Sequence, residues 1–245
     1  MKRRRLDKHM VEIGLAASRE RARELIESGQ VKVDGMPAQK PASQVAVGAS
    51  VVLTGPQLQY VSRGGLKLHQ ALDAFNVDVA GAVVLDVGAS TGGFTDCVLQ
   101  RGAKKVYAVD VGYGQLAWKL RADDRVVVLE RTNVRALTQQ HIPESVDVIV
   151  VDCSFIGLDK VVPPATVFMK QGGQLLALVK PQFEVGRGGV GKGGVVRDAA
   201  IRSAAIDRVR ADVEAIGYTL LGGVDCDTHG PSGNVEYLLH AEKHA

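Results

Sequence analysis

Short apolar runs recur along the chain from residue 83 to the end, and stretches with helical periodicity lie between most of them. Runs of this kind, rich in valine and leucine, are typical of strands that are buried on both faces of a sheet. Their alternation with helices predicts an α/β fold with a seven-stranded, mostly parallel sheet. The expected strands are residues 83–87, 105–109, 126–129, 146–151, 174–179, 218–224 and 236–241, and the expected helices are residues 94–101, 114–121 and 198–216, with a turn near residues 158–166.

The first 60 residues have a different pattern, which predicts a small α+β domain. A short helix over residues 6–15 is expected to stop near Gly14. Ser18 is a good N-cap and Gly29 a good C-terminal stop for a second helix over residues 19–28. Two short strands are expected after this helix pair, at residues 31–33 and 50–53, with a turn at Asp34-Gly35.

Glycine and proline mark the boundary between this domain and the rest of the chain. Residues 54–65 contain Gly55-Pro56 and Gly64-Gly65, which punctuate structure and indicate a linker. A helix over residues 66–75 is expected to follow. We therefore expect two domains, residues 1–60 and residues 61–245.

Composition narrows the class of protein. The chain has 245 residues, of which 46% are hydrophobic, so a sizeable core can be buried. There is no run of 18 apolar residues, and no apolar signal-peptide core follows the basic N-terminus, which predicts a cytoplasmic protein without a membrane span. The three cysteines have no metal-ligand spacing, so we expect reduced, partly buried thiols and no metal site.

Charge is unevenly distributed. Residues 1–60 carry ten Lys/Arg and six Asp/Glu, a balance of +4, whereas the remainder carries 20 against 21, a balance of −1. Arg19, Arg21 and Arg23 cannot all share the buried face of the second helix. A basic end on a neutral body favours contact with a polyanion, although a solvated charged face is the alternative.

A glycine-rich loop follows the first strand of the larger domain and opens a helix. Such a loop lies at the carboxyl edge of a parallel sheet, where free N–H groups bind ligands. Its spacing does not fit the dinucleotide pattern G-x-G-x-x-G. An acid before the first glycine suits a cationic methionine group, and Asp110, 22 residues after that glycine, suits ribose hydroxyls. We therefore expect S-adenosylmethionine to bind at Asp86, Gly88, Ala89, Ser90, Gly92, Gly93 and Phe94, together with Asp110.

A second glycine-rich segment, residues 186–192, fits the spacing G-x-x-x-x-G-K of a phosphate-binding loop. It is followed by Gly193, where such a loop needs Ser or Thr for magnesium, and it comes after a late strand. We interpret it as a loop at the rim of the site. For Arg187 and Lys192, contact with RNA and plain solvation are both open.

Four charged residues stand at strand ends or just before the second domain: Lys67, Asp152, Lys180 and Glu236. Strand ends on the cofactor side of such a sheet converge on one site. Charges buried there are costly unless they are paired.

Two resemblances give these patterns a context. The segment RLDKHMVEIGLAASRERARELIESGQVKVDG resembles the S4-type RNA-binding domain, in which a helix pair and a V-x-V-D/N-G hairpin contact structured RNA through phosphates. The segments SRGGLKL, LDVGASTGGFTD, VDVGYGQLAWKLR, LERTN, VDCSFI, LVKPQFEVG, GGVVRD and GPSGNVEY resemble the TlyA-type branch of the FtsJ-like ribose 2′-O-methyltransferases. The second resemblance runs over nearly the whole chain.

The resemblance implies a Rossmann-like methyltransferase domain that acts on cytidine ribose in ribosomal RNA, with ribosomal RNA or ribosomal subunits as partners. The family's Lys-Asp-Lys-Glu tetrad falls on Lys67, Asp152, Lys180 and Glu236. The resemblance also adds Val111, Asn133 and Asp152 to the residues expected to bind S-adenosylmethionine. The implied RNA contacts are Arg4, Arg5, Arg19, Arg21, Arg23, Lys32, Arg63, Arg187 and Lys192. The interdomain linker departs from the family's basic-x-Trp-Val pattern, because the chain has Leu58-Gln59-Tyr60-Val61.

The chemistry leaves some roles open. Lys180 is a candidate base for the ribose hydroxyl, and Lys67 could position the ribose or hold the developing alkoxide. Cys153 is a packed thiol or, less favoured, a cytosine nucleophile, while Phe155 is either a stacking platform for a base or part of the core. Two alternative functions are a membrane-active, haemolysin-like protein and a non-catalytic ribosome-binding factor. The sequence does not determine the oligomeric state.

Overall fold

The computed structural model describes residues 3–16, 18–27, 29–54, 59–186, 189–191, 193–230 and 233–244, and of residues 20, 21 and 24 it describes only the backbone. Among the residues expected to bind RNA, the side chain of Arg21 and all of Arg187 and Lys192 therefore lie outside the described part. The chain divides into two compact units, Met1–Leu58 and Gln59–Ala245. Each unit is described by itself.

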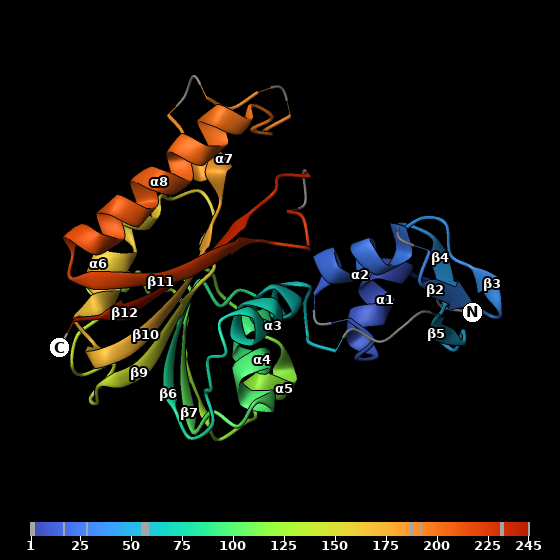
Figure 1. The fold of residues 1–245 in the computed structure, drawn as a ribbon. Coiled ribbons are helices and arrows are strands. Elements are labelled where there is room, and N and C mark those ends of the chain that lie inside the picture. Colours follow the sequence, from blue (N-terminus) through green and yellow to red (C-terminus); the bar gives the residue numbers. More distant parts are fainter. Residues whose placement is uncertain are drawn as a thin grey trace. The chain divides into compact units, whose positions relative to one another are not determined.

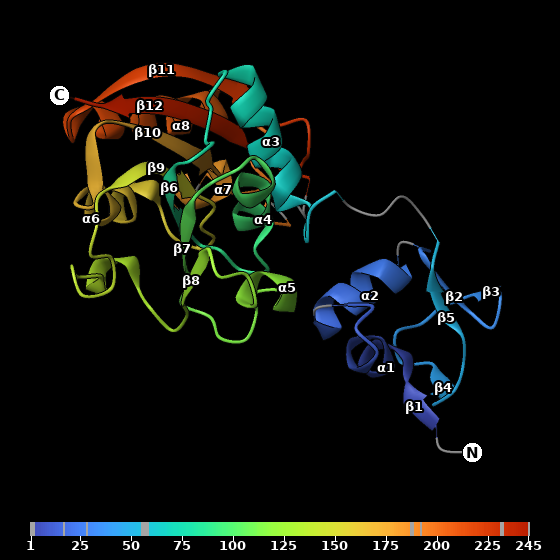
Figure 2. The same ribbon diagram turned by 90° about the horizontal axis from the view of Figure 1, so that it is seen from below.

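Two helices and two small sheets form the first unit. The helices α1 (Leu6–Glu12) and α2 (Arg19–Glu27) lie side by side (Figure 2), and Leu6, Met10 and Ile26 are buried between them and the strands. Strand β2 pairs antiparallel with β3 and β5, and β1 pairs antiparallel with β4. The strands are β1 Arg3–Arg5, β2 Val31–Val33, β3 Met36–Pro37, β4 Gln44–Ala46 and β5 Val51–Leu53.

Three of these strands were not expected from the sequence. Strands β1, β3 and β4 have two or three residues each, and three consecutive arginines in β1 show no alternation of apolar and polar positions. Their backbone groups are paired across the chain, because β1 meets β4 about forty residues later. Strand formation here depends on tertiary pairing rather than on local pattern.

A seven-stranded sheet forms the centre of the second unit (Figure 1), which confirms the predicted fold class. The strand order is β11-β12-β10-β9-β6-β7-β8, and β12 runs antiparallel to both of its neighbours while the central pairs are parallel. The strands are β6 Val83–Val87, β7 Lys105–Val109, β8 Val126–Leu129, β9 Val146–Val151, β10 Met169–Val179, β11 Tyr218–Asp225 and β12 Tyr237–Lys243.

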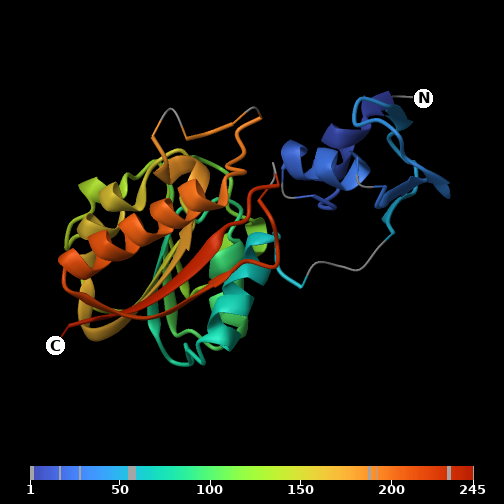
Figure 3. The same ribbon diagram turned by 45° about the horizontal axis from the view of Figure 1, so that its top comes forward.

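Helices cover both faces of the sheet (Figures 1 and 3). Along β6 the side chains alternate: Leu85 and Val87 pack with α6 and α8, whereas Val84 packs with α3 and α4 on the opposite face. In the described part of this unit the helices are α3 Gly64–Ala74, α4 Gly93–Gln100, α5 Trp118–Arg121, α6 Val162–Thr166, α7 Pro181–Glu184 and α8 Ala199–Ala215, with 3₁₀ turns at Val134–Ala136 and Leu158–Lys160.

Several expected boundaries were wrong. Strand β10 begins at Met169 rather than at residue 174, because Met169 already pairs with Val146 of β9 before a register shift. The expected helix over residues 114–121 is only Trp118–Arg121, because the backbone N–H groups of Gly114, Gln115 and Leu116 donate to the carboxylate of Glu130. The last strand begins at Tyr237, so Glu236 precedes it rather than opening it. In the described residues, no helix has both the length and the apolar character that crossing a membrane requires.

The longest of these helices, α8, has a side-chain cap at Asp198, which the sequence had placed inside the helix. Asp198 accepts hydrogen bonds from Ala200 N at 2.8 Å and Ile201 N at 3.2 Å. These bonds satisfy two of the N–H groups that a helix start leaves without partners. We expect Asp198→Ala to lower the free energy of unfolding by about 1 kcal/mol. The measurement is urea unfolding followed by circular dichroism.

A control variant lies on the same helix. Asp207→Ala removes an exposed carboxylate from the middle of α8, and we expect its free energy of unfolding to stay within about 0.5 kcal/mol of the wild type. Equal losses in both variants would contradict a specific capping role for Asp198.

Candidate active site

The loop between β6 and α4 is shaped by glycine. Gly88 and Gly92 have φ of 87° and 97°, in the left-handed region that favours glycine, and Ser90 has φ of 48°. A Cβ atom on Gly88 would lie 2.6 Å from the carbonyl oxygen of Asp152, and one on Gly92 would overlap the side chain of Leu120. The space beside these glycines is therefore filled by the protein itself. The sequence had suggested that these glycines let a ligand approach closely. In the structure their small size instead allows the loop to pack against Asp152 and Leu120.

Asp86 ends up inside the protein, on the face of β6 that meets α4. Its side chain is fully buried, and Oδ2 accepts a 2.6 Å hydrogen bond from Thr95 Oγ1. Its Oδ1 has no hydrogen-bond partner among the described residues. Burial, together with the nearby carboxylates of Asp152 and Asp110, raises the pKa of Asp86 to about 7, against the hydrogen bond from Thr95. A buried acceptor without a partner is a place where a cationic or hydrogen-bonding ligand would gain energy.

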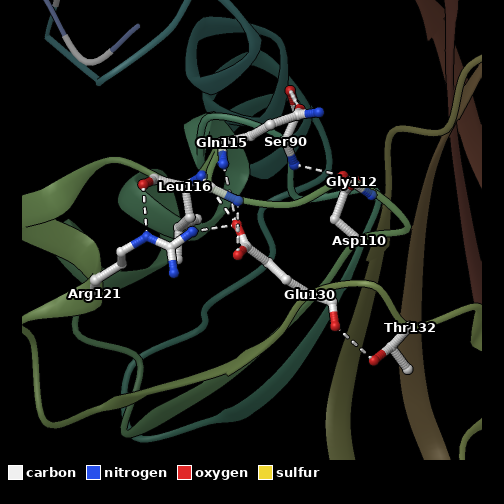
Figure 4. Close-up of polar contacts among 9 residues, drawn as sticks. Ser90, Asp110, Gly112, Gln115, Leu116, Arg121, Glu130 and Thr132 are labelled. Atoms are coloured by element: carbon white, nitrogen blue, oxygen red, sulfur yellow. Dashed lines mark hydrogen bonds and ion pairs between the residues drawn. The ribbon is translucent and has the colours of Figure 1, made fainter. Parts of the chain in front are cut away.

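Asp110, which follows β7, connects two neighbouring loops. Its Oδ2 accepts from Ser90 N at 2.8 Å and its Oδ1 accepts from Gly112 N at 2.6 Å (Figure 4). Each oxygen keeps a second lone pair for a further donor such as a hydroxyl. The adjacent Val111 is exposed, and the Asn133 side chain caps a 3₁₀ turn by accepting from Arg135 N at 3.0 Å. The structure thus places Ser90 and Asp110 together, while Asn133 has a local structural partner.

The four charged residues form two ion pairs. Lys67, on α3, forms a buried ion pair with Glu236, although 169 positions separate them in the chain. Lys180, which follows β10, has its Nζ 2.6 Å from Oδ1 of Asp152, which follows β9. That second contact lacks hydrogen-bond geometry, and Lys180 Nζ also donates a hydrogen bond to Ser154 Oγ at 2.9 Å. Each buried cation therefore has a carboxylate partner, as its desolvation requires.

The start of α3 lies next to the second ion pair. A Cβ atom built on Gly64, the first residue of α3, would be 3.5 Å from Asp152 Oδ2 and 3.8 Å from the ring of Phe94. Likewise, a Cβ on Gly93 would overlap Ser62 Oγ and lie 2.8 Å from Gly65 N. Close packing of the two helix starts thus brings the helix that carries Lys67 against the loop of Asp86 and against Asp152.

Several residues of this region were missed by sequence reasoning. Ser154 binds the ammonium of Lys180, Thr95 binds Asp86, and the buried carboxylate of Asp96 accepts from Val61 N at 2.8 Å and pairs with Lys119 at 2.9 Å. All three lie inside quoted motifs, one or two residues from a predicted site residue. Nothing in their type distinguishes them from ordinary polar residues before the fold is known.

Phe155 and Cys153 have environments that decide between earlier alternatives. The Phe155 ring is 89% exposed, with its centroid 5.0 Å from that of Phe183, which excludes the core-packing alternative. Burial, strengthened by the charge of Asp152, raises the pKa of the Cys153 thiol to about 12. A thiolate nucleophile needs a lowered pKa, so the packed-thiol interpretation is favoured. All three cysteines are free, and Cys97 and Cys226 are buried, as predicted.

In the first unit a buried carboxylate organises two of the predicted RNA-contacting arginines. Asp7 is fully buried and accepts from Arg5 at 3.1 and 2.9 Å and from Arg19 at 3.0 Å. The bonds from Arg5, joined by those from Arg19, hold the pKa of Asp7 well below its usual range in spite of burial. The two guanidinium side chains remain 45% and 59% exposed, so both can still meet a ligand.

The other residues predicted to contact RNA differ in their exposure and partners. Arg4 forms an ion pair with Glu12, Lys32 is half-buried, and Arg23 and Arg63 are exposed. Among the described residues, no group of three His, Cys, Asp or Glu side chains is arranged to hold a metal ion.

Comparisons with known proteins find matches over both units. The sequence profile of the FtsJ-like methyltransferase family matches residues 60–243, and that of the S4 domain matches residues 4–51. The chain is 50% identical over 239 residues to the 16S/23S rRNA (cytidine-2′-O)-methyltransferase TlyA of Mycobacterium tuberculosis, covering 97% of this chain and 89% of that one. It is 38% identical over 240 residues to hemolysin A of Brachyspira hyodysenteriae, covering 96% and 98%. A solved structure of a hemolysin candidate from Streptococcus thermophilus superposes with a TM-score of 0.79 at 41% identity, covering 100% of this chain and 90% of that one.

The raised pKa of Asp86 makes a prediction about stability. The folded protein keeps a proton on this carboxyl up to about pH 7, whereas the unfolded chain releases it near 3.8. The stability that this bound proton contributes is therefore fully present below pH 3.8, the pKa in the unfolded chain. It falls by about 1.4 kcal/mol for each pH unit as the pH rises toward the pKa of about 7 in the folded protein. We expect Asp86→Asn to lose this slope and to be more stable than the wild type at pH 8.

Urea unfolding of both proteins between pH 4 and pH 8 measures the difference. Thr95→Val serves as a second variant, because it removes the hydrogen bond that favours the charged carboxylate and should extend the slope to higher pH. Parallel pH profiles for the wild type and Asp86→Asn would show that the buried carboxyl does not titrate in this range.

Proposed function

The chain belongs to the FtsJ-like methyltransferase family, and we propose that it transfers a methyl group from S-adenosylmethionine to the 2′-hydroxyl of cytidine in ribosomal RNA. The observation that carries this proposal is the pair of lysine–carboxylate contacts, Lys67 with Glu236 and Lys180 with Asp152, beside the β6–α4 loop. Ribose methylation needs a group that removes a proton from a weak nucleophile, and a site that excludes water. Lysines held at the sheet edge supply such a group.

The residues around the β6–α4 loop fit S-adenosylmethionine. The unpartnered Oδ1 of Asp86 suits the cationic end of the cofactor, and the lone pairs of Asp110 suit ribose hydroxyls. When bound, the cofactor supplies an electrophilic methyl group. The proposed cofactor-binding residues are Asp86, Gly88, Ala89, Ser90, Gly92, Gly93, Phe94, Asp110, Val111, Asn133 and Asp152.

We assign the proton transfer to Lys180. Lys67 is hydrogen-bonded to a fully buried carboxylate, which holds its charge and its position, so it suits the stabilisation of a developing alkoxide. Lys180 contacts half-buried Asp152 without hydrogen-bond geometry and donates to the hydroxyl of Ser154. As the neutral amine it would accept the proton of the ribose hydroxyl, and Asp152 would pair with the ammonium that forms. Alignment of the hydroxyl with the methyl group supplies much of the remaining rate. The exposed ring of Phe155 offers a stacking surface for the target base.

The two units divide the work in this proposal. Residues 1–60 bind RNA phosphates through Arg5, Arg19 and their basic neighbours, and residues 61–245 carry out methyl transfer. The S4 domain match to residues 4–51 supports the first assignment. An enzyme of this kind works on ribosomal RNA or ribosomal subunits in the cytoplasm.

The direct test is methyl transfer from labelled S-adenosylmethionine to small subunits, large subunits and naked ribosomal RNA. We expect label at the 2′-oxygen of cytidine, and the three substrates show which subunit is used and whether assembly is required. Absence of transfer to all three, with the cofactor bound, would favour a non-catalytic ribosome-binding protein. The hemolysin names of two similar proteins motivate a parallel assay of dye release from liposomes, where we expect none.

The proposed role of Lys180 in proton transfer can be tested separately from any effect on folding or cofactor binding. We expect Lys180→Ala to bind S-adenosylhomocysteine like the wild type but to lose methyl transfer by about 10²- to 10⁴-fold, as for removal of a general base. Isothermal titration and single-turnover transfer measure the two properties.

Lys170→Ala is a matched control. Lys170 pairs with Asp147 across the same two strands, β10 and β9, but near their opposite ends. We expect this variant to keep both cofactor binding and transfer. Wild-type transfer rates in Lys180→Ala would exclude it as the base.

The arginines held by Asp7 generate a prediction about RNA affinity. Each phosphate contact releases counterions, so we expect Arg19→Gln to weaken binding to ribosomal RNA and to reduce the slope of log affinity against log salt by about 1. Arg210→Gln, which neutralises an exposed arginine of α8, is the control. An unchanged salt slope in Arg19→Gln would remove Arg19 from the RNA contacts.

A further inference from the structure

Glu130 directly follows β8 and directs its carboxylate into the segment that follows β7 (Figure 4). Oε2 accepts from Gly114 N at 2.9 Å, and Oε1 accepts from Gln115 N at 3.1 Å and Leu116 N at 3.4 Å. The side chain is only 9% exposed. One carboxylate thus binds three successive backbone N–H groups of another loop.

Arg121, on α5, completes this arrangement. Its guanidinium forms an ion pair with Oε1 of Glu130, and its Nε donates to the carbonyl oxygen of Leu116 at 3.0 Å. The two side chains therefore hold both the N–H and the C=O groups of the same segment. We call Glu130 and Arg121, with the segment 112–116 that they hold, the carboxylate clamp.

The ionised form of Glu130 is the form that the clamp requires. Burial alone would raise the pKa of Glu130, but the hydrogen bonds from Gly114 N, Arg121 and Leu116 N lower it below its usual range. A charged carboxylate that accepts backbone N–H groups forms stronger hydrogen bonds than a neutral acceptor does. The clamp therefore combines an ion pair with three hydrogen bonds to the backbone of another loop.

The clamp is connected to the cofactor loop on both sides. At the start of the segment, Asp110 accepts from Gly112 N and from Ser90 N of the β6–α4 loop. Past its end, Ala117 N donates to the carbonyl oxygen of Thr91 at 3.1 Å. The backbone beyond Glu130 is joined in the same way, because Thr132 N donates to the carbonyl oxygen of Asp110 at 3.0 Å. Three consecutive strand-end loops are thereby fixed to one another.

We propose that Glu130 is a positioning residue for the cofactor: it holds the segment 112–116 so that Asp110 and Val111 are preorganised for S-adenosylmethionine. Both of its oxygens are occupied by protein donors, so it acts through the loop and needs no contact with the ligand. The inference rests on the proposed function, since it takes Asp110 and Val111 as cofactor-binding residues. It predicts an effect on cofactor affinity and not on the proton transfer at Lys180.

The variant Glu130→Gln tests the clamp. Glutamine keeps one acceptor oxygen but turns an amide NH₂ toward N–H donors or toward Arg121, so donor faces donor and the charge that pairs with Arg121 is lost. We expect the dissociation constant for S-adenosylhomocysteine and the KM for S-adenosylmethionine to rise about tenfold. The KM for RNA and kcat at saturating cofactor should stay within about twofold of the wild type. Without ligand, amide hydrogen exchange should accelerate at residues 112–116.

Glu144→Gln is the matched control. Glu144 likewise pairs with a cation, Lys105, and accepts a second hydrogen bond from Tyr107. Lys105 begins β7 and Tyr107 is at its middle, whereas Asp110 follows its last residue. We expect it to bind S-adenosylhomocysteine with wild-type affinity.

The outcomes separate this inference from the proposed function. Wild-type cofactor affinity in Glu130→Gln, or an equal loss in Glu144→Gln, overturns the positioning role while leaving the methyltransferase assignment intact. A fall in kcat at saturating cofactor, with KM unchanged, also overturns it. If the wild-type protein itself binds no S-adenosylhomocysteine, the proposed cofactor fails and the inference fails with it.

Discussion

Buried carboxylates need partners, and the carboxyl edge of the seven-stranded sheet brings several of them together. Glu236 is neutralised by Lys67, Asp152 by Lys180, and Glu130 by Arg121 and three backbone N–H groups. Asp86 accepts a hydrogen bond from the hydroxyl of Thr95 but has no cationic partner among the described residues, and burial raises its pKa. Desolvation would make each charge costly alone, so the partners determine which carboxylates remain charged. The position of every loop at this edge depends on that pairing.

Close packing is the second constraint on the site. Gly88 fits against the backbone of Asp152, and Gly93 fits against Gly65 at the start of α3, so a larger residue at either glycine would separate these loops. The helix that carries Lys67 is thereby held against the loop that contains Asp86. The glycine-rich loop is therefore an assembly point for the charged residues, independently of its proposed contact with the cofactor.

The first unit uses the same physical device for a different purpose. Asp7 is buried, and its charge orients Arg5 and Arg19 while leaving both guanidinium groups partly exposed. An arginine has five donors in a fixed plane, so one that is anchored by a carboxylate keeps donors for a phosphate. If these arginines bind RNA as proposed, their anchoring by a buried acid reduces the conformational entropy that binding would otherwise cost.

The sequence by itself determined the order of the strands along the chain in the large sheet, the helix pair and the four charged positions at or near strand ends, because these follow from local periodicity. It could not determine that Lys67 pairs with Glu236 rather than Asp152, nor that the expected helix over residues 114–121 loses its first half. Tertiary structure decided both. The partners are distant in sequence, and a buried carboxylate such as Glu130 can compete with a helix for the same backbone N–H groups.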